Sequence, residues 1–219
     1  ESVASVRVAL LSANSTGTVD DHAMVSPSSL VASGNVLSND GIAHADGAVH
    51  VVNAGSYQGV MGELSLDADG TFSYQLDSDL ASVRSLGKGV SALDTFDYSA
   101  LSADGTRSGS AQIHVRVEGE NDAPEAEGDI AKVYRDGFST TQGNVLDNDV
   151  DVDDGDVLSV VGFGVYAGEY GTFNLRENGE FTYTLDTGNP TVMALTPNTE
   201  LFDYFDYFIA DNWGAQSET

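Results

Sequence analysis

The 219-residue sequence has no cysteine, only 8 basic residues, and no apolar run of the length a membrane helix needs. Without cysteine no disulfide can hold the fold, and without an apolar run no direct membrane insertion is expected. The shortage of Lys and Arg leaves 35 acidic side chains largely uncompensated, with a formal net charge of -27. Such a surface repels nucleic acid, so none is expected as a partner.

Helix-length periodic stretches are also missing, whereas the 24 glycines and the recurrence of Val, Thr, Tyr and Phe favour an all-β chain. Catalytic patterns are absent as well. His22, His44, His50 and His114 lie in no zinc-site or nucleophile spacing, and no cysteine is available. We therefore expect a protein that is not an enzyme.

A long internal repeat is present instead. Gly34 recurs as Gly143, 109 residues later, and the motifs around it recur at the same distance. The repeated motifs are Gly-Asn-Val-Leu at 34–37 and 143–146, Asn-Asp at 39–40 and 148–149, Gly-x-Phe-x-Tyr-x-Leu-Asp at 70–77 and 179–186, and Asp-x-Phe-Asp-Tyr at 94–98 and 203–207. The chain therefore holds two copies of one domain.

The repeated segments read as short strands. Residues 63–66 and 71–76 alternate polar and apolar side chains around an Asp-Gly turn, and the second copy repeats this hairpin. Residues 112–117 alternate with Ile113, Val115 and Val117 facing inward. Short strands with Gly and Asp turns predict an all-β fold in which each copy forms a Greek-key β-sandwich of about seven strands.

An Asp-rich loop in the second copy predicts a metal site. Carboxylates alternate through Asp149, Asp151, Asp153 and Asp156, and Gly155 permits a sharp turn. Calcium prefers six to eight oxygen ligands, which aspartate supplies well. The first copy keeps only Asp40 in place, so its site is expected to be lost or weak.

A second acidic cluster lies between the copies. Its candidate calcium ligands are Glu118, Glu120, Asn121 and Asp122, with Asp129 following within reach. A metal here would tie the end of the first domain to the start of the second. The alternative is an acidic linker without metal.

These motifs together resemble the VCBS repeats, also called cadherin-like bacterial repeats. The resemblance rests on Asn-Asp-Ala-Pro at 121–124, the Gly-Asn-Val-Leu-x-Asn-Asp motif with its Asp-rich loop, and the two aromatic motifs. It implies tandem immunoglobulin-like sandwiches in large secreted adhesins and biofilm proteins, stiffened by calcium. On this resemblance Asp149, Asp151, Asp153 and Asp156 match the Asp-rich motif, and Asn121 and Asp122 match the junction motif.

The repeat also divides the chain. We expect a lone strand over residues 1–11, a first repeat over 12–122, and a second repeat over 123–219 without its own last strand. Val6-Arg7-Val8 lines up with Val115-Arg116-Val117. Residues 1–8 are therefore predicted to complete the second copy of another molecule, with Ala4, Val6 and Val8 inward.

We therefore expect a non-catalytic structural or adhesive protein, secreted to the bacterial cell surface, that assembles head-to-tail with itself into a filament. One alternative is a spacer fragment of a giant surface adhesin. Another is a carbohydrate-binding module, with surface glycan as partner and with Trp213, Tyr166 and Tyr170 as a stacking platform.

Overall fold

The computed structural model describes residues 17–41, 49–103, 105 and 108–218. The chain forms two compact units, Glu1–Glu120 and Asn121–Thr219, called unit 1 and unit 2 below. The sequence placed the boundary of the repeats between residues 122 and 123. The predicted donor residues Ala4, Val6 and Val8 lie outside the described residues.

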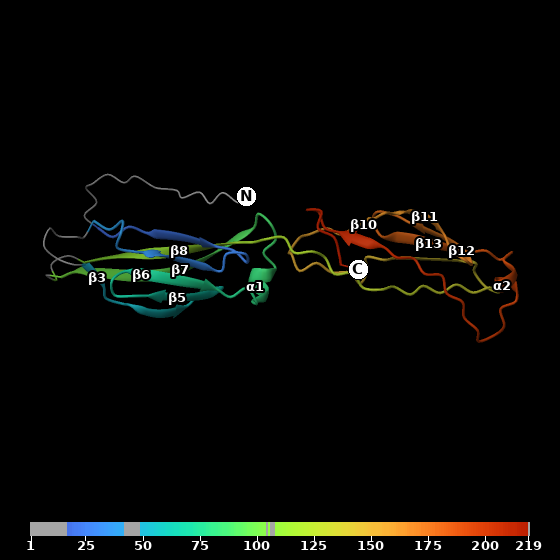
Figure 1. Cartoon of the computed structure of the whole chain (residues 1–219), viewed down its shortest axis with the longest axis horizontal. Helices are drawn as coiled ribbons and strands as arrows, with labels where there is room; N and C mark the ends of the chain where they lie inside the picture. Colours follow the sequence, from blue (N-terminus) through green and yellow to red (C-terminus); the bar gives the residue numbers. More distant parts are fainter. Residues whose placement is uncertain (1–16, 42–48, 104, 106–107, 219) are drawn as a thin grey trace. The chain divides into compact units, whose positions relative to one another are not determined.

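Unit 1 is built from two four-stranded sheets (Figure 1). Their strand orders are β1-β8-β7-β3 and β2-β6-β5-β4, so the chain crosses repeatedly between sheets as in a Greek key. All neighbours pair antiparallel except β1 and β8, which pair parallel. The elements are β1 (Asp21–Val25), β2 (Val31–Asn35), β3 (Val49–Val51), β4 (Gly55–Gln58), β5 (Gly62–Leu66), β6 (Thr71–Leu76), α1 (Ala81–Arg84), β7 (Ser91–Ser102) and β8 (Ser108–Glu118).

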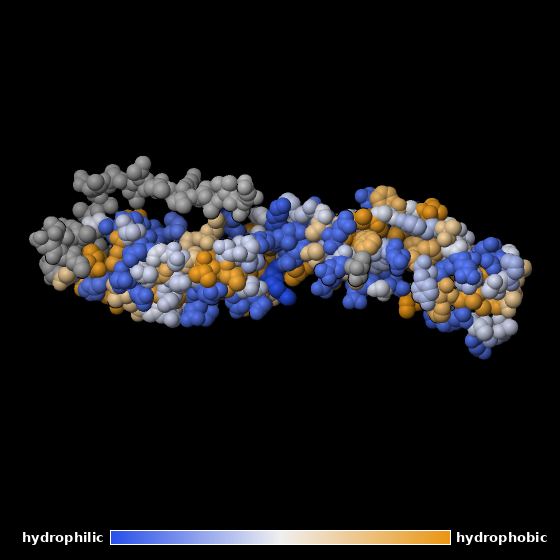
Figure 2. Space-filling model, in the orientation of Figure 1, coloured by the Kyte–Doolittle hydropathy of each residue, from blue (hydrophilic) through white to orange (hydrophobic). Residues whose placement is uncertain are grey.

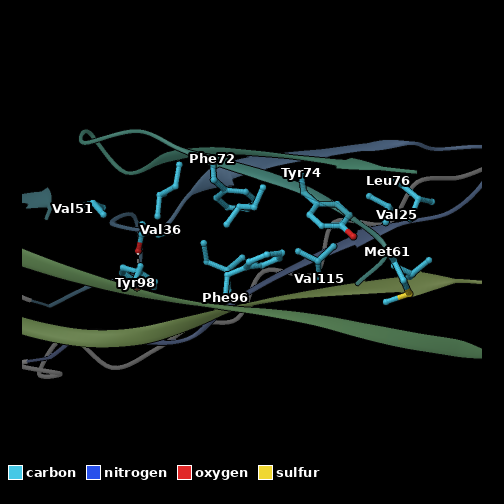
Figure 3. Close-up of a cluster of buried hydrophobic side chains, with 14 of the residues drawn as sticks. Val25, Val36, Val51, Met61, Phe72, Tyr74, Leu76, Phe96, Tyr98 and Val115 are labelled. Atoms are coloured by element: carbon cyan, nitrogen blue, oxygen red, sulfur yellow. Dashed lines mark hydrogen bonds between the residues drawn. The ribbon is translucent and has the colours of Figure 1, made fainter. Parts of the chain in front are cut away.

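The core of unit 1 lies between its two sheets and follows the predicted alternation. Figure 3 shows Phe72 and Tyr74 of β6 facing Phe96 and Tyr98 of β7. The inward residues of β8, namely Ile113, Val115 and Val117, are completely buried. The predicted hairpin and the predicted inward face of the last strand are both confirmed.

Unit 2 repeats this architecture in part. A sheet of order β11-β12-β13-β9 matches the second sheet of unit 1, and a two-stranded sheet pairs β10 with β14. The elements are β9 (Thr140–Asn144), β10 (Ser159–Val161), β11 (Gly164–Ala167), β12 (Gly171–Leu175), β13 (Glu180–Leu185), α2 (Pro190–Met193) and β14 (Phe208–Ala210). Among the described residues of unit 2, no strand corresponds to β1 or β8.

The repeated Gly-Asn-Val-Leu motif has the same structural role in both units. A Cβ on Gly34 would lie 2.7 Å from the ring of Phe72, and one on Gly143 would lie 2.8 Å from the ring of Phe181. The following asparagine accepts a hydrogen bond from the amide two residues later and donates to the hairpin turn. The motif therefore fastens β2 to β6 and β9 to β13.

The Asp of the second aromatic motif is a hydrogen-bonded latch that is buried in unit 1 and half-buried in unit 2. In unit 1 the Asp94 carboxylate accepts hydrogen bonds from the amides of Val60 and Met61 and from the Tyr74 hydroxyl. In unit 2 Asp203 accepts from two amides and from the Tyr183 hydroxyl in the same way. The predicted fold class, all-β with two immunoglobulin-like sandwiches, is confirmed.

The face of the described chain seen in Figure 2 is a mixture of hydrophilic residues and gathered apolar ones. The two helices have four residues each. No helix in the described part of the chain is long and apolar enough to cross a membrane.

Candidate metal centre

The Asp-rich loop of unit 2 lies between β9 and β10 and is folded by its own side chains. The Asp153 amide donates to Asp151 Oδ1 (2.9 Å), and the Asp156 amide donates to the Asp153 carbonyl (3.3 Å). Gly155 adopts a φ of 93°, in the left-handed region that glycine enters without strain. These turns bring alternate acidic residues of the loop together.

Asp211 joins this loop from a distant part of the sequence. The carboxylate oxygens of Asp151, Asp156 and Asp211 lie within 4.8 Å of one another. Asp211 directly follows β14, and its Oδ1 accepts hydrogen bonds from three successive amides of the turn at 213–215. The turn therefore fixes Asp211 in place, and the oxygens of three aspartates converge.

The first residues of unit 2 complete the cluster. The Asn121 side-chain amide donates to Asp211 Oδ2 (2.6 Å), and the Asp122 amide donates to Asp153 Oδ2 (2.9 Å). Both Asp153 and Asp211 are buried, at 3% and 5% exposure. We call this cluster of Asn121, Asp151, Asp153, Asp156 and Asp211 the carboxylate cage.

Several oxygens of the carboxylate cage have no partner. Seven buried side-chain oxygens in the described part of the chain accept no hydrogen bond, and four of them belong to the cage: Asn121 Oδ1, Asp151 Oδ2, Asp153 Oδ1 and Asp156 Oδ2. Buried polar atoms nearly always have a partner, and an unpaired buried anion is strongly unfavourable. Hard oxygen ligands without partners are what a calcium ion binds, so the chemistry of these residues fits calcium.

The electrostatics of the carboxylate cage agree with this reading. Burial raises the pKa of Asp153, and the negative charges of Asp122, Asp151 and Asp156 raise it further. Burial also acts to raise the pKa of Asp211, but hydrogen bonds from Asn121 and the turn amides hold that pKa below its ordinary value. Hydrogen bonds thus favour the charged form of Asp211, whereas burial and neighbouring negative charges disfavour the charged form of Asp153.

Two predicted ligands lie in a different cluster, around Tyr207. The Tyr207 hydroxyl donates to Asp129 Oδ2 (2.9 Å), while Asp149 accepts from the Glu127 amide (2.8 Å). Burial raises the pKa of both carboxyls. Asp149 and Asp129 are therefore close to each other, but they do not belong to the converging group of Asp151, Asp156 and Asp211.

The same cluster is present in unit 1, which lacks the Asp-rich loop. The Tyr98 hydroxyl contacts both oxygens of Asp40, at 3.1 and 3.2 Å, and Asp40 accepts from the Val19 amide. The tyrosine–aspartate contact thus belongs to the repeated fold. It fastens the first segment of each unit to Tyr98 on β7 in unit 1 and to Tyr207, just before β14, in unit 2.

The remaining predicted ligands lie at the end of unit 1. Glu118 forms an exposed ion pair with Arg116 (3.3 Å). Glu120 accepts hydrogen bonds from the side chains of Ser26 and Ser28. Burial acts to raise the pKa of Glu120, but the hydrogen bonds from these hydroxyls outweigh burial and lower that pKa.

Unit 1 has no counterpart of the carboxylate cage in its sequence. The residues 109 positions before Asp151, Asp153, Asp156 and Asp211 are Ile42, His44, Gly47 and Ser102. Of these only Ser102 is among the described residues. Asp211 was not predicted as a ligand. Comparison of the two copies could have identified Asp211, because copy two has an aspartate at this position where copy one has Ser102.

The proposed aromatic platform remains a hypothesis. Trp213 and Tyr166 are 51% and 38% exposed, and Tyr170 is half-buried. The Tyr166 hydroxyl donates to the Gly162 carbonyl. Measuring binding of the whole chain to a glycan array tests whether this surface recognises carbohydrate.

Residues 121–219 match the family described as Bacterial cadherin-like domain. This match covers unit 2 and supports a cadherin-like repeat. No curated protein sequence matches the chain.

Several solved structures are similar at low identity. Mouse protocadherin-24 EC1-3 is 15% identical with a TM-score of 0.47, covering 90% of this chain and 65% of that chain. The extracellular domain of protocadherin GammaB4 is 19% identical with a TM-score of 0.46, covering 90% of this chain and 30% of that one. An endo-fucoidan hydrolase, MfFcnA4, is 11% identical with a TM-score of 0.29, covering 92% of this chain and 26% of that one. This chain therefore spans less than two thirds of the length of these structures.

Proposed function

We propose that this chain is a calcium-binding, non-catalytic module of an extracellular bacterial adhesive protein. The observation that carries the proposal is the carboxylate cage, with four buried oxygens that lack a hydrogen-bond partner. The bacterial cadherin-like match over residues 121–219 supports an extracellular, adhesion-type structural domain, a class that is not enzymatic.

The donor set favours calcium over other cations. It contains one amide oxygen from Asn121 and carboxylates from Asp151, Asp153, Asp156 and Asp211, with no nitrogen or sulfur ligand. Calcium accepts six to eight oxygens at flexible geometry, so water or backbone carbonyls complete the shell. When bound, the ion supplies positive charge that neutralises the mutual repulsion of these carboxylates.

Calcium then orders the start of unit 2. Asn121 and Asp122 are held by the side chains of Asp211 and Asp153 respectively. Because Asn121 directly follows Glu120, the last residue of unit 1, fixing it restricts the chain at the boundary of the units. We expect the ion to stiffen the repeat array in this way.

The test compares two neutralising substitutions with a matched control. Asp151→Asn and Asp211→Asn remove ligands of the cage, whereas Asp154→Asn removes the same charge from an exposed side chain of the same loop. Calorimetric calcium titration of the whole chain should show at least about tenfold weaker binding for the first two. The Asp154 variant should bind as the wild type does. Equal affinities in all four proteins would refute the carboxylate cage.

In unit 2 the segment 203–207 pairs with no described strand, although residues 215–217 bond to β14 directly after it. Phe205 and Tyr207 are half-buried, whereas their counterparts Phe96 and Tyr98 are buried beneath the pairing of β7 with β8. Such a segment leaves apolar side chains and backbone groups without a partner strand. We propose that residues 1–8 of a second copy add a strand here, which joins molecules head-to-tail into a filament.

The assembly is tested by light scattering of the whole chain over a range of concentrations. Val6→Asp with Val8→Asp places charge on the inward side chains and should abolish concentration-dependent assembly. Ser5→Asp alters an outward position of the same segment and should leave assembly intact. A wild-type chain that stays monomeric throughout, or a Val6/Val8 variant that still assembles, would instead support a spacer whose missing strand comes from further sequence in a longer chain.

A further inference from the structure

Two segments of unit 2 correspond to paired strands of unit 1 but have no strand partner of their own. Residues 131–133, Ala-Lys-Val, match Ala-Met-Val at 23–25 on β1, 108 positions earlier. The match holds in space, because the repeated tyrosine hydroxyl contacts the carbonyl of Val19 in unit 1 and of Glu127 in unit 2. Residues 201–206 match a part of β7 that pairs with β8. Among the described residues, neither segment forms a strand.

The inward side chains of both segments are less covered than their counterparts in unit 1. Val25 and Phe96 are buried, at 2% and 8% exposure, whereas Val133 and Phe205 are half-buried. In unit 1 both β1 and β7 pair with β8, which lies between them in the sheet. The two segments of unit 2 therefore lack the cover that a central strand supplies in unit 1.

Both segments are nonetheless held in place near their ends. The Tyr207 hydroxyl contacts the Glu127 carbonyl (3.1 Å) at the start of the first segment. At its other end, the Arg135 guanidinium donates to two backbone carbonyls at and just after the end of α2. In the second segment, Asp203 accepts hydrogen bonds from the Tyr170 amide and from a tyrosine hydroxyl of β13. Walls that are already ordered reduce the entropic cost of adding a strand between them.

We propose that these two segments are the walls of a slot that takes one strand between them, parallel to residues 129–133 and antiparallel to residues 201–205. The directions follow from β8, which pairs parallel with β1 and antiparallel with β7. The occupant is residues 1–8 of a second copy, so this inference rests on the strand donation proposed above. Val-Arg-Val at 6–8 repeats the Val-Arg-Val of β8 at 115–117. Insertion between two walls gives the strand two ladders of backbone hydrogen bonds, whereas addition at one edge gives one.

The repeat also fixes the register of the inserted strand. On β8, Arg116 has one residue of β1 and one residue of β7 directly opposite it. The matching positions around Arg7 are Lys132 in the first wall and Phe202 in the second. Both of these side chains are exposed. Because Arg7 is predicted to face outward, substitutions at these three positions probe the register without altering the core.

The slot should select a small side chain at position 4. Ala4 corresponds to the larger Ile113 of β8, which lies opposite the counterpart of Phe205. Phe205 stacks on Phe173 with ring centroids 4.6 Å apart, whereas unit 1 has the smaller Leu64 in place of Phe173. A larger ring on the facing sheet leaves less room beside Phe205, and a smaller residue on the added strand conserves the total volume. Residues 1–8 therefore suit this slot better than a copy of β8 does.

Disulfide cross-linking of whole chains tests the insertion, because the sequence has no cysteine of its own. A chain with Arg7→Cys is mixed, in a glutathione redox buffer, with a chain that carries either Lys132→Cys or Phe202→Cys. Both mixtures should give a covalent dimer. The control partner is Val165→Cys, which is 69% exposed on β11 of the other sheet and should give no dimer above background.

The outcomes separate the slot from the proposed assembly. Cross-links to only one wall, in chains whose light scattering still shows assembly, would mean that the strand adds at an edge; this result overturns the slot and keeps strand donation. Equal cross-linking to Val165→Cys would also overturn the slot. Chains that show neither assembly nor cross-links would overturn both proposals.

The size selection has its own test by light scattering. Ala4→Ile should raise the concentration needed for half-maximal assembly by about tenfold or more, because it overpacks the slot. Adding Phe173→Leu to the same chain should restore assembly, since it returns the lost room. Undiminished assembly of the Ala4→Ile chain, or no recovery in the double variant, would overturn the size selection.

Discussion

Unit 1 and unit 2 carry the same repeat but are stabilised differently. In the described residues, the main core cluster of unit 1 holds sixteen buried apolar residues from both sheets, whereas that of unit 2 holds five. Unit 2 instead has most of the buried oxygens that lack a partner. Two copies that share their hairpins and latches thus differ in the size of the apolar core and in the number of buried oxygens without a partner.

The largest effect should come from the core of unit 1. Ile113 is fully buried on β8, so Ile113→Ala should lower the unfolding free energy of unit 1 by about 2–5 kcal/mol. Ile130 of unit 2 is 86% exposed, and Ile130→Ala should change stability by no more than about 0.5 kcal/mol. Denaturant unfolding followed by amide signals of each unit measures both. Similar losses in the two variants would remove the contrast between the units.

Chelation of calcium should act on unit 2 alone. If calcium is present at about 100 times its dissociation constant, removing it should lower the unfolding free energy by about 2.7 kcal/mol. Trp213 is the sole tryptophan and lies next to the carboxylate cage, so its fluorescence reports the unfolding of unit 2. A matching fall in the stability of unit 1 would show that the ion is not confined to unit 2.

The aspartate latches should differ in strength. Asp94 is 2% exposed and accepts three hydrogen bonds, so Asp94→Ala leaves buried donors unpaired and should cost about 1–3 kcal/mol. Asp203 is half-buried, so water can replace the lost partner in Asp203→Ala. Thermal melts of both variants should show the larger loss in unit 1. An equal loss of stability would mean that water reaches the donors around Asp203 no more easily than those around Asp94.

The smallest effect concerns pH in unit 1, measured with chelator present. Burial, aided by the charges of Asp40 and Asp20, raises the pKa of Asp21 to about 7. A carboxyl with a raised folded-state pKa stabilises the fold when protonated and loses that contribution as pH rises through the folded value. From pH 6 to 8 the unfolding free energy of unit 1 should fall by on the order of 1 kcal/mol, and by less where water screens Asp21 from its acidic neighbours. Asp21→Asn should flatten this part of the pH profile; an unchanged slope would place the titration elsewhere.

The sequence predicted what depends on local pattern. Alternation identified the inward faces of β6 and β8, and carboxylate spacing identified Asp151, Asp153 and Asp156. Contacts between residues that are distant in the sequence could not be predicted from local pattern. Asp211 joins the cage only because the end of β14 lies beside the loop, and His22 meets His114 only through the parallel pairing of β1 and β8.

Asp149 combines a role in the fold with a role that stays a prediction. It accepts a hydrogen bond from the Glu127 amide near Tyr207, as its first-copy counterpart Asp40 accepts one from the Val19 amide near Tyr98. Its Oδ2 is also a buried oxygen without a hydrogen-bond partner. Its predicted role as a metal ligand therefore stays a prediction.

A calcium titration of the isotope-labelled whole chain, followed residue by residue through backbone amide resonances, tests the central claim most directly. The account predicts saturable shifts at 121–122, 151–156 and 211–215, with no comparable response in unit 1 at Asp40 or Ser102. Shifts of equal size in both units, or none at residues 151–156 and Asp211, would contradict it.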